Sequence, residues 1–525
     1  MRALAVALAC LACAGSAQAE WYRASSKHFV IYSEQELESL RKYAETLERF
    51  DAAVRTIRGM DDLPPSQGNR LTIFSLFDPA DVARLAGDKT GLTAGFYRGR
   101  AAGSVAVASR TGSGAVHVAP KTGTRLGGGE LNLVAGTGIV LLHEYSHHLM
   151  MQDVATPYPE WLIEGFAEFM STARFEPDGV GLGLPATHRF LGLIEGEALP
   201  LETLLSGRYE RINAEQRESI YGYGWLLAHY LTFEPSRKGQ LETYLRDMAR
   251  GTDPLEAARQ AFGDLAMLKR DLGAYLNRPR LQYIKLTGPE LRSAPVSVTQ
   301  LSAGGSAVLP VLVEVKNGVT AAQAEDVARR VRAVQARFPG DELVETTLAE
   351  AELDANHPET AEAAADRAIK ANPRNAEAIV LKGRAIAERA GAAGRTERQG
   401  LFAEARKRFL AANSLDKEDP EPLMEFYYSF ARQGVPATAN AVAALHYASD
   451  LAPQDSGLRM TSALQYLSDG KVAEARRTLG PIAFDPHGGE FAQLARQVLA
   501  KVNGGDVEGA LAIADAASTE GAGSR

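Results

Sequence analysis

The sequence predicts an α+β protein that begins with a mixed β-sheet and helix region and ends in an all-α solenoid of helical repeats. Three observations support this fold class. Residues 20–120 combine short β-branched and aromatic runs with a long amphipathic helix. Residues 121–283 are mainly helical and include an apolar run that carries paired histidines. Residues 321–518 are alanine-rich, and small residues recur there at the spacing of a helix pair.

Composition narrows the class of protein. The chain has 525 residues, of which 45% are apolar and 23% charged, which is typical of a globular protein with roughly two to four domains. Its net charge of −8 predicts no basic surface, so we expect no nucleic-acid partner. Beyond the N-terminus, no segment has the roughly 18 consecutive apolar residues of a transmembrane helix.

The N-terminus, residues 1–19, has the pattern of a secretory signal peptide. A basic start at Arg2 precedes an apolar run at 3–14 that is too short to span a bilayer, and an A-x-A cleavage site follows. The two cysteines of the chain, Cys10 and Cys13, both lie here, so any metal site must use histidine and carboxylate ligands. We expect an exported protein, bacterial periplasmic or secreted. The short run before either cysteine favours this over a lipoprotein.

The β-rich region 20–120 is predicted from runs of β-branched and aromatic residues between turns. Helical apolar spacing marks one long helix, which a glycine ends. The expected strands are 28–33, 71–77, 94–97, 104–108 and 115–119, and the expected helices are 37–54, ended by Gly59, and 79–87.

The motif that organises the chain is H-E-x-x-H, formed by His143, Glu144 and His147 within residues 139–153. No glycine or proline interrupts this apolar segment, which predicts a buried helix. Residues four apart share a helix face, so the two imidazoles would lie side by side and could hold one zinc ion. Glu144 would lie on the adjoining face, within reach of a water molecule at the metal.

A third ligand is needed, because a catalytic zinc ion usually has three protein ligands. The candidates are Glu160, Glu164 and Glu168, all on a predicted helix at 160–171. Glu164 lies mid-helix among apolar residues, where a carboxylate is costly unless a partner such as zinc neutralises it. Glu168 follows one turn later on the same face, which suits it to accept the free N–H of a ligand histidine.

The motif, followed by the W-L-x-E-G-F-A element that starts at Trp161, resembles the gluzincin metallopeptidases of the thermolysin and aminopeptidase N types. The resemblance implies a zincin catalytic domain over residues 20–283. It implies one Zn²⁺ ion per chain, held by His143, His147 and Glu164, with Glu144 as the general base. It also implies an outermost strand that pairs with the substrate backbone, and we expect 103–109 in that role.

A later helix carries a second point of resemblance. In the aminopeptidase N group a helix opens with Tyr-x-x-Gly, and its tyrosine donates a hydrogen bond to the tetrahedral intermediate. The match here is Tyr221 with Gly224. Tyr223 and His229 are alternative donors, since a histidine does this in the thermolysin type. A purely structural role for these aromatic side chains is also open.

The expected substrate is a peptide or protein. The aminopeptidase group binds the free amine of its substrate with a G-x-M-E-N element, and this chain has none, which favours an endopeptidase. Two alternatives remain. One is an exported repeat scaffold whose zinc site is structural or vestigial. The other is a zinc hydrolase that acts on a non-protein amide, such as cell-wall peptide.

Residues 284–320 are expected to be a β-containing linker, because prolines break the helical pattern and 296–299 and 307–315 have the composition of strands. Residues 321–518 resemble tetratricopeptide repeats. The first unit, 342–375, has small residues and a proline at the positions typical of that repeat, whereas later units are looser, with an insertion near 390–400.

The repeat resemblance implies paired helices stacked into a solenoid whose concave face binds a protein partner. A generic alanine-rich helical bundle is the alternative. The tail, 519–525, is expected to be disordered.

Overall fold

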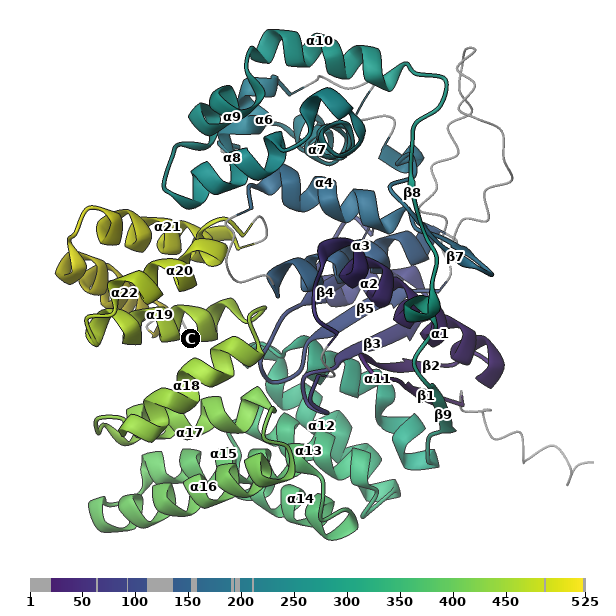
Figure 1. Cartoon of the computed structure of the whole chain (residues 1–525). Helices are drawn as coiled ribbons and strands as arrows, with labels where there is room; N and C mark the ends of the chain where they lie inside the picture. The colour runs from purple at the N-terminus through teal and green to yellow at the C-terminus, as the bar shows by residue number, and fades with distance from the viewer. Residues whose placement is uncertain are drawn as a thin grey trace, which may run out of the picture.

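The computed structural model has the predicted α+β architecture: a mixed sheet, a helical part and a helical solenoid (Figure 1). It describes residues 20–62, 65–91, 93–110, 136–152, 158–189, 193, 199–209, 212–485 and 488–522. The predicted signal peptide and the predicted strand at 115–119 lie outside the described residues. In the described part of the chain, none of the helices is both long and apolar enough to cross a membrane.

In the described residues, six strands form the N-terminal sheet in the order β4-β5-β3-β2-β1-β9. β2, β3 and β5 are parallel, whereas β1, β4 and β9 are antiparallel to their neighbours. The strands predicted at 28–33, 71–77, 94–97, 104–108 and 296–299 are confirmed as β2, β3, β4, β5 and β9, whereas β1 was not predicted. Their bounds are β1 (Tyr22–Ser25), β2 (Phe29–Ser33), β3 (Leu71–Leu76), β4 (Gly95–Arg98), β5 (Val105–Ser109) and β9 (Ser297–Gln300).

Two helices connect these strands. α1 (Leu37–Arg58) runs between the parallel strands β2 and β3, and it ends at Gly59, whose φ of 63° suits glycine. Its buried side packs against the sheet in the main hydrophobic core. α2 (Pro79–Ala86) follows β3, with the Asp78 side chain capping its first turn.

The predicted substrate-pairing strand is corrected. β5, which covers most of 103–109, is bonded on both sides, to β3 and β4, so it is an interior strand. All five of its residues are buried, as expected of a strand covered on both faces. β4 is instead the outermost described strand at this end of the sheet. It lies against the histidine-bearing helix, since a Cβ at Gly95 would be 2.8 Å from Val140 Cγ1.

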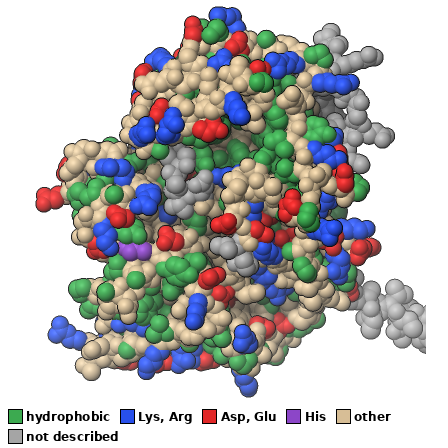
Figure 2. Space-filling view, viewed as in Figure 1, with side chains coloured by type: hydrophobic (Ala, Val, Ile, Leu, Met, Phe, Trp, Pro, Cys, Tyr) green, Lys and Arg blue, Asp and Glu red, His purple; other side chains and the backbone are tan. Residues whose placement is uncertain are grey.

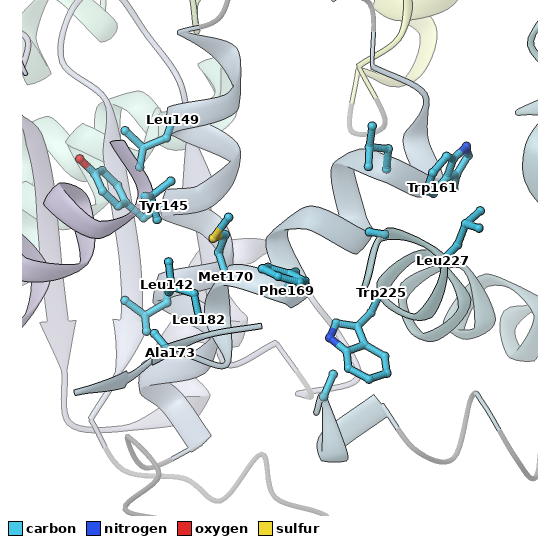
Figure 3. Packing of buried hydrophobic residues seen from close by; sticks show 14 of the residues in the cluster. Leu142, Tyr145, Leu149, Trp161, Phe169, Met170, Ala173, Leu182, Trp225 and Leu227 are labelled. Atoms are coloured by element: carbon cyan, nitrogen blue, oxygen red, sulfur yellow. The ribbon is translucent and has the colours of Figure 1, made fainter. Parts of the chain in front are cut away.

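The helical part lies above the sheet in Figure 1. In Figure 3, α4 lies between α3 and α7, with Phe169 and Met170 on one side and Trp161 near Leu227 on the other. The region also contains a small antiparallel sheet, β6-β7-β8, that the sequence analysis missed. The helical part consists of α3 (Gly136–Met151), α4 (Glu160–Ser171), β6 (Arg174–Glu176), β7 (Gly179–Leu182), α6 (Leu201–Ser206), α7 (Ala214–Phe233), α8 (Gln240–Ala249), α9 (Pro254–Phe262), α10 (Leu265–Leu276) and β8 (Ile284–Leu286).

The strand predicted at 307–315 is wrong: these residues belong to helix α11 (Ala303–Asn317), which Ser302 caps. A short apolar run fits a buried strand or a buried helix equally well. This helix is apolar on two sides because it lies between two cores. Val308, Val311 and Val315 pack with the solenoid, whereas Leu309, Leu312 and Val313 pack with Trp21, Phe74, Val105 and Val107 of the sheet. Since β9 joins the N-terminal sheet, 284–320 is not a separate β module.

The solenoid consists of α11 and eleven further helices in the described residues. They are α12 (Ala321–Arg337), α13 (Glu342–Asp354), α14 (Pro358–Ala371), α15 (Ala376–Ala392), α16 (Arg395–Leu415), α17 (Pro420–Gln433), α18 (Ala439–Leu451), α19 (Ser456–Ser468), α20 (Val472–Ala483), α21 (Gly489–Asn503) and α22 (Val507–Ala522). The disorder predicted for 519–525 is wrong as far as Ala522, where α22 ends, and residues 523–525 lie outside the described residues.

The solenoid is tetratricopeptide-like in how its helices meet. The small residues singled out in the sequence, Ala349, Ala361 and Ala368, are fully buried between helices of the first unit. In the next unit a Cβ at Gly383 would lie 2.5 Å from the Phe409 ring. Small residues at these positions allow close helix approach, as the repeat pattern requires.

The solenoid curves around loops of the N-terminal sheet (Figure 1). The Gln454 side chain, in the turn between α18 and α19, donates hydrogen bonds to Asn69 and Ser104, and the Ala101 N–H donates to Asp455 at 2.8 Å. The chain itself therefore takes up part of the inner surface that was expected to bind a partner.

Candidate metal centre

The two motif histidines lie on the buried side of α3. Their Nε2 atoms are 3.0 Å apart, and their rings are nearly perpendicular, at 86°. Helical geometry places residues four apart on one face, and the apolar flanks bury that face. His143 and His147 therefore present two imidazole nitrogens to one point.

α4 brings Glu164 to the same point. Its Oε2 lies 3.2 Å from His143 Nε2 and 3.5 Å from His147 Nε2, and the three candidate ligand atoms all lie within 4.8 Å of one another. Two imidazoles and one carboxylate form a donor set that suits zinc. The three residues could thus hold a metal ion.

The electrostatics favour a cation between these groups. Burial lowers the pKa of His143, but the carboxylates of Glu164 and Glu168 outweigh it and raise that pKa to about 10. The protein thus stabilises a positive charge at His143, the place where a bound metal ion would add one.

Glu168 lies behind His143, one turn after Glu164. Its Oε1 is 3.1 Å from His143 Nδ1, so it can accept the ring proton and leave Nε2 for a metal. His188 Nε2 lies 2.6 Å from Glu168 Oε2, and Arg189 Nε donates to Oε1 at 2.8 Å. Burial alone would raise the pKa of Glu168, but Arg189 and His143 hold it well below its usual value.

Sequence reasoning missed His188 and Arg189. They lie in the short 3₁₀ turn Thr187–Arg189, which carries no motif and is distant in sequence from the histidine helix. Only the fold brings them to the buried carboxylate.

Glu144 is half-buried on α3, beside the two candidate ligand histidines. Burial raises the pKa of both Tyr97 on β4 and Tyr221 on α7, and the charge of Glu144 adds a smaller contribution to each. The face of the molecule in Figure 2 is hollowed between α3 and α4, and hydrophobic side chains gather in the hollow.

Tyr221 lies at the same centre. Its ring centroid is 6.0 Å from that of His143, and the Arg189 guanidinium lies 4.5 Å over the ring. Burial, with a smaller contribution from Glu164, raises the pKa of Tyr221, so its hydroxyl keeps its proton at neutral pH and can donate it in a hydrogen bond.

Two glycines set the distance between α4 and α7. A Cβ at Gly165 would lie 2.3 Å from backbone atoms of Gly224, and a Cβ at Gly224 would lie 2.4 Å from the Trp161 carbonyl oxygen. Both glycines stand in the motifs, but only the structure shows that they meet. Their contact brings together the backbones of the two helices that carry Glu164 and Tyr221.

The two alternative donors lie elsewhere. His229 is two turns further along α7, and its ring nitrogens contact the Tyr275 hydroxyl at 2.9 Å and the carbonyls of Gly183 and Gln282 at 3.0 Å. The structure therefore does not bring His229 to the centre. Tyr223 is half-buried against the core, and two residues along a helix turn it about 200° from Tyr221.

A second group of candidate ligands, His28, Asp51 and Asp62, lies behind α3. Arg55 Nε and the Tyr145 hydroxyl donate to Asp51 at 2.8 and 2.7 Å. Cations and donors of the chain itself thus satisfy this group. Its evident effect is to brace α3 through Tyr145.

Comparisons with known proteins add little to this geometry. No protein-family model matches the chain, and no curated protein matches it. Among solved structures the chain is similar to a thermophilic TPR protein from Thermus thermophilus, with a TM-score of 0.30 and 17% identity, covering 34% of this chain and 90% of that one. The repeat character of the solenoid rests on its own helix pairs.

Proposed function

We propose that the protein is a zinc-dependent peptidase of the gluzincin type. The observation that carries this proposal is the buried convergence of His143, His147 and Glu164, with Glu144 and Tyr221 beside it. A metal site with a purely structural role requires neither a half-buried carboxylate, as at Glu144, nor a tyrosine hydroxyl, as at Tyr221, at its edge.

The proposed reaction is hydrolysis of a peptide bond. Zinc bound by the three ligands would supply Lewis acidity toward the attacking water and the scissile carbonyl. Glu144 accepts the proton of that water and returns it to the leaving amine. Tyr221 donates a hydrogen bond to the oxyanion that develops on the carbonyl. Glu168 and Arg189 keep His143 in the orientation that leaves Nε2 toward Glu164.

β4 is the proposed docking strand for substrate. It is the outermost described strand beside α3, and its Tyr97 hydroxyl lies 2.8 Å from Nδ1 of His148 on that helix. An extended peptide can add to such an edge through backbone hydrogen bonds, which depend neither on the side chains of the peptide nor on a free amine. Together with the missing G-x-M-E-N element, this favours an endopeptidase.

The test is metal analysis with peptide-library cleavage on the wild type and on Glu144→Gln. We expect one zinc ion per chain in both proteins and loss of nearly all cleavage in the variant, because the ligands remain and the base is lost. Full cleavage by Glu144→Gln would refute the mechanism. Zinc binding without cleavage of any peptide by the wild type would instead favour the repeat scaffold with a vestigial site. Cleavage restricted to cell-wall peptide would favour the non-protein amide.

A further inference from the structure

A cavity lies between the N-terminal sheet and the inner side of the solenoid, and none of the candidate metal ligands His143, His147 and Glu164 lines it. Its volume is about 830 Å³, and a smaller cavity of about 260 Å³ adjoins it at Ala102, Gly103 and Lys316. Strands β1, β2, β3 and β5 form one wall, and the N-terminal turns of α11, α13, α15 and α17 form the other. This size is that of a small-molecule site.

Two arginines on the sheet wall lack a carboxylate partner among the described residues. Arg23 makes no side-chain hydrogen bond or ion pair with any of them, and its Nε is buried. Arg70 is only 7% exposed, and it donates to Ser25, Ser26 and Gln67, all of them neutral, while its Nε has no partner. Burial and the nearby charge of Arg23 lower the pKa of Arg70. Tyr32 and Glu48 act in the opposite direction on that pKa, but neither forms an ion pair with Arg70. The wall thus carries two positive charges without an ion-pair partner among the described residues.

The carboxylates on the opposite wall form no ion pair with Arg23 or Arg70 among the described residues, and several of them have other hydrogen-bond partners. Glu377 accepts from Lys316 Nζ at 2.5 Å, Glu342 accepts from the Asn375 side-chain amide at 3.0 Å, and Asp416 accepts from the Gln67 N–H at 2.8 Å. Asp341 caps the first turn of α13.

Two further acidic groups of that wall are close to neutral. Burial raises the pKa of Asp419 to about 7 and that of Glu421 to about 8, so both hold a proton much of the time near pH 7. A buried charge without an ion-pair partner is costly, which makes Arg70 beside Arg23 unfavourable unless an anion joins them.

We propose that this cavity binds a small anionic molecule, with Arg23 and Arg70 as the groups that hold its carboxylate or phosphate. Guanidinium groups form paired, charge-assisted hydrogen bonds with both kinds of anion. The occupant links the sheet to the solenoid, since both walls line the cavity. This site is independent of the metal centre and of the proposed peptidase activity.

The test is calorimetric titration and thermal unfolding of the full chain with inorganic phosphate and, separately, with succinate. We expect at least one of the two anions to bind and to raise the unfolding temperature, equally in zinc-loaded and chelator-treated protein. Preference for succinate identifies a carboxylate ligand, and preference for phosphate a phosphorylated one. No binding of either anion overturns the proposal.

Arg23→Gln distinguishes a ligand group from a structural one. Because Arg23 has no partner among the described residues and repels Arg70, the variant should unfold at the same temperature as the wild type or higher when no anion is added. It should bind the preferred anion about tenfold more weakly or worse, since a charged hydrogen bond is lost. Arg84→Gln, on an exposed part of α2, should bind normally. Unchanged anion affinity in Arg23→Gln, or a loss of stability without anion, overturns the assignment.

Discussion

The Glu168 carboxylate lies 3.1 Å from Nδ1 of His143, on the opposite edge of the ring from the Nε2 atom that faces Glu164. α3 thus carries the candidate ligand His143, and Glu168 of α4 sets the orientation of its ring. Glu168 is held in turn by His188 and Arg189, so a network of buried charges fixes the ligand before any metal binds.

Glu168→Gln should weaken zinc binding. The variant keeps the size of the side chain but removes the charge that favours the Nδ1–H tautomer of His143, and changes of this kind typically cost about 10–100-fold in metal affinity. Competition with a chromogenic chelator measures the affinity. Glu160→Gln, at the start of the same helix, serves as the matched control. Equal zinc affinity in Glu168→Gln and wild type would contradict the role.

Tyr221→Phe should lower kcat by about 10²-fold or more while zinc content and KM change little, because the hydroxyl is proposed to act only on the developing oxyanion. Steady-state kinetics on a cleaved peptide provide the measurement. Tyr223→Phe removes a hydroxyl from the opposite side of the same helix and should retain activity. The reverse pattern would assign the donor to Tyr223.

Gly165→Ala should destabilise the protein, because the new Cβ would lie 2.3 Å from the backbone of Gly224 and α7 would have to move. Overpacking of this kind costs about 1–3 kcal/mol. Thermal unfolding measures the loss. Gly273→Ala in α10, where nothing lies within 4 Å, should be stabilising by about 0.5–1 kcal/mol. A normal unfolding temperature for Gly165→Ala would contradict the close contact.

Stability should fall as pH rises from about 4 to about 8. Asp419 and Glu421 bind their protons more tightly in the folded chain, with pKa values of about 7 and about 8, than at their ordinary values of 3.8 and 4.5. The folded state therefore holds more protons in this window, and their contribution is full below it and lost above it. Arg384 opposes the shift of Glu421, whereas Glu377 and Glu425 add to it.

The double variant Asp419→Asn, Glu421→Gln should flatten this dependence, since neither side chain titrates and asparagine can still cap α17. Denaturant unfolding at a series of pH values is the measurement. An unchanged slope in the double variant would show that other groups cause the dependence.

Gln454→Ala should loosen the solenoid from the sheet. Its amide nitrogen contacts the Asn69 side chain, the Arg100 carbonyl and the Ser104 hydroxyl, and the variant would leave these buried groups without that donor. We expect faster hydrogen exchange in residues 99–105, read by mass spectrometry. Gln465→Ala, whose amide bonds only within the solenoid, should leave that exchange unchanged. Equal exchange in both variants would contradict the docking role of Gln454.

Local sequence patterns were sufficient to predict the helix that carries His143 and His147 and to predict the helical repeats. The pairing of His143 with His147 follows from helical geometry over one turn, and the close contact at Gly383 follows from a small residue at a fixed repeat position. Peptidase activity, zinc as the bound metal and export remain predictions from the sequence.

Only the tertiary structure decided which segments meet. An apolar run such as that of α11 is compatible with a strand or a helix until its two packing partners are known, and β5 is interior only because β4 pairs with it. The hydrogen bond from Arg189 to Glu168 joins residues that share no motif. The cavity at Arg23 and Arg70 exists only where the solenoid packs over the sheet. Such contacts depend on how whole elements pack, and no local spacing encodes them.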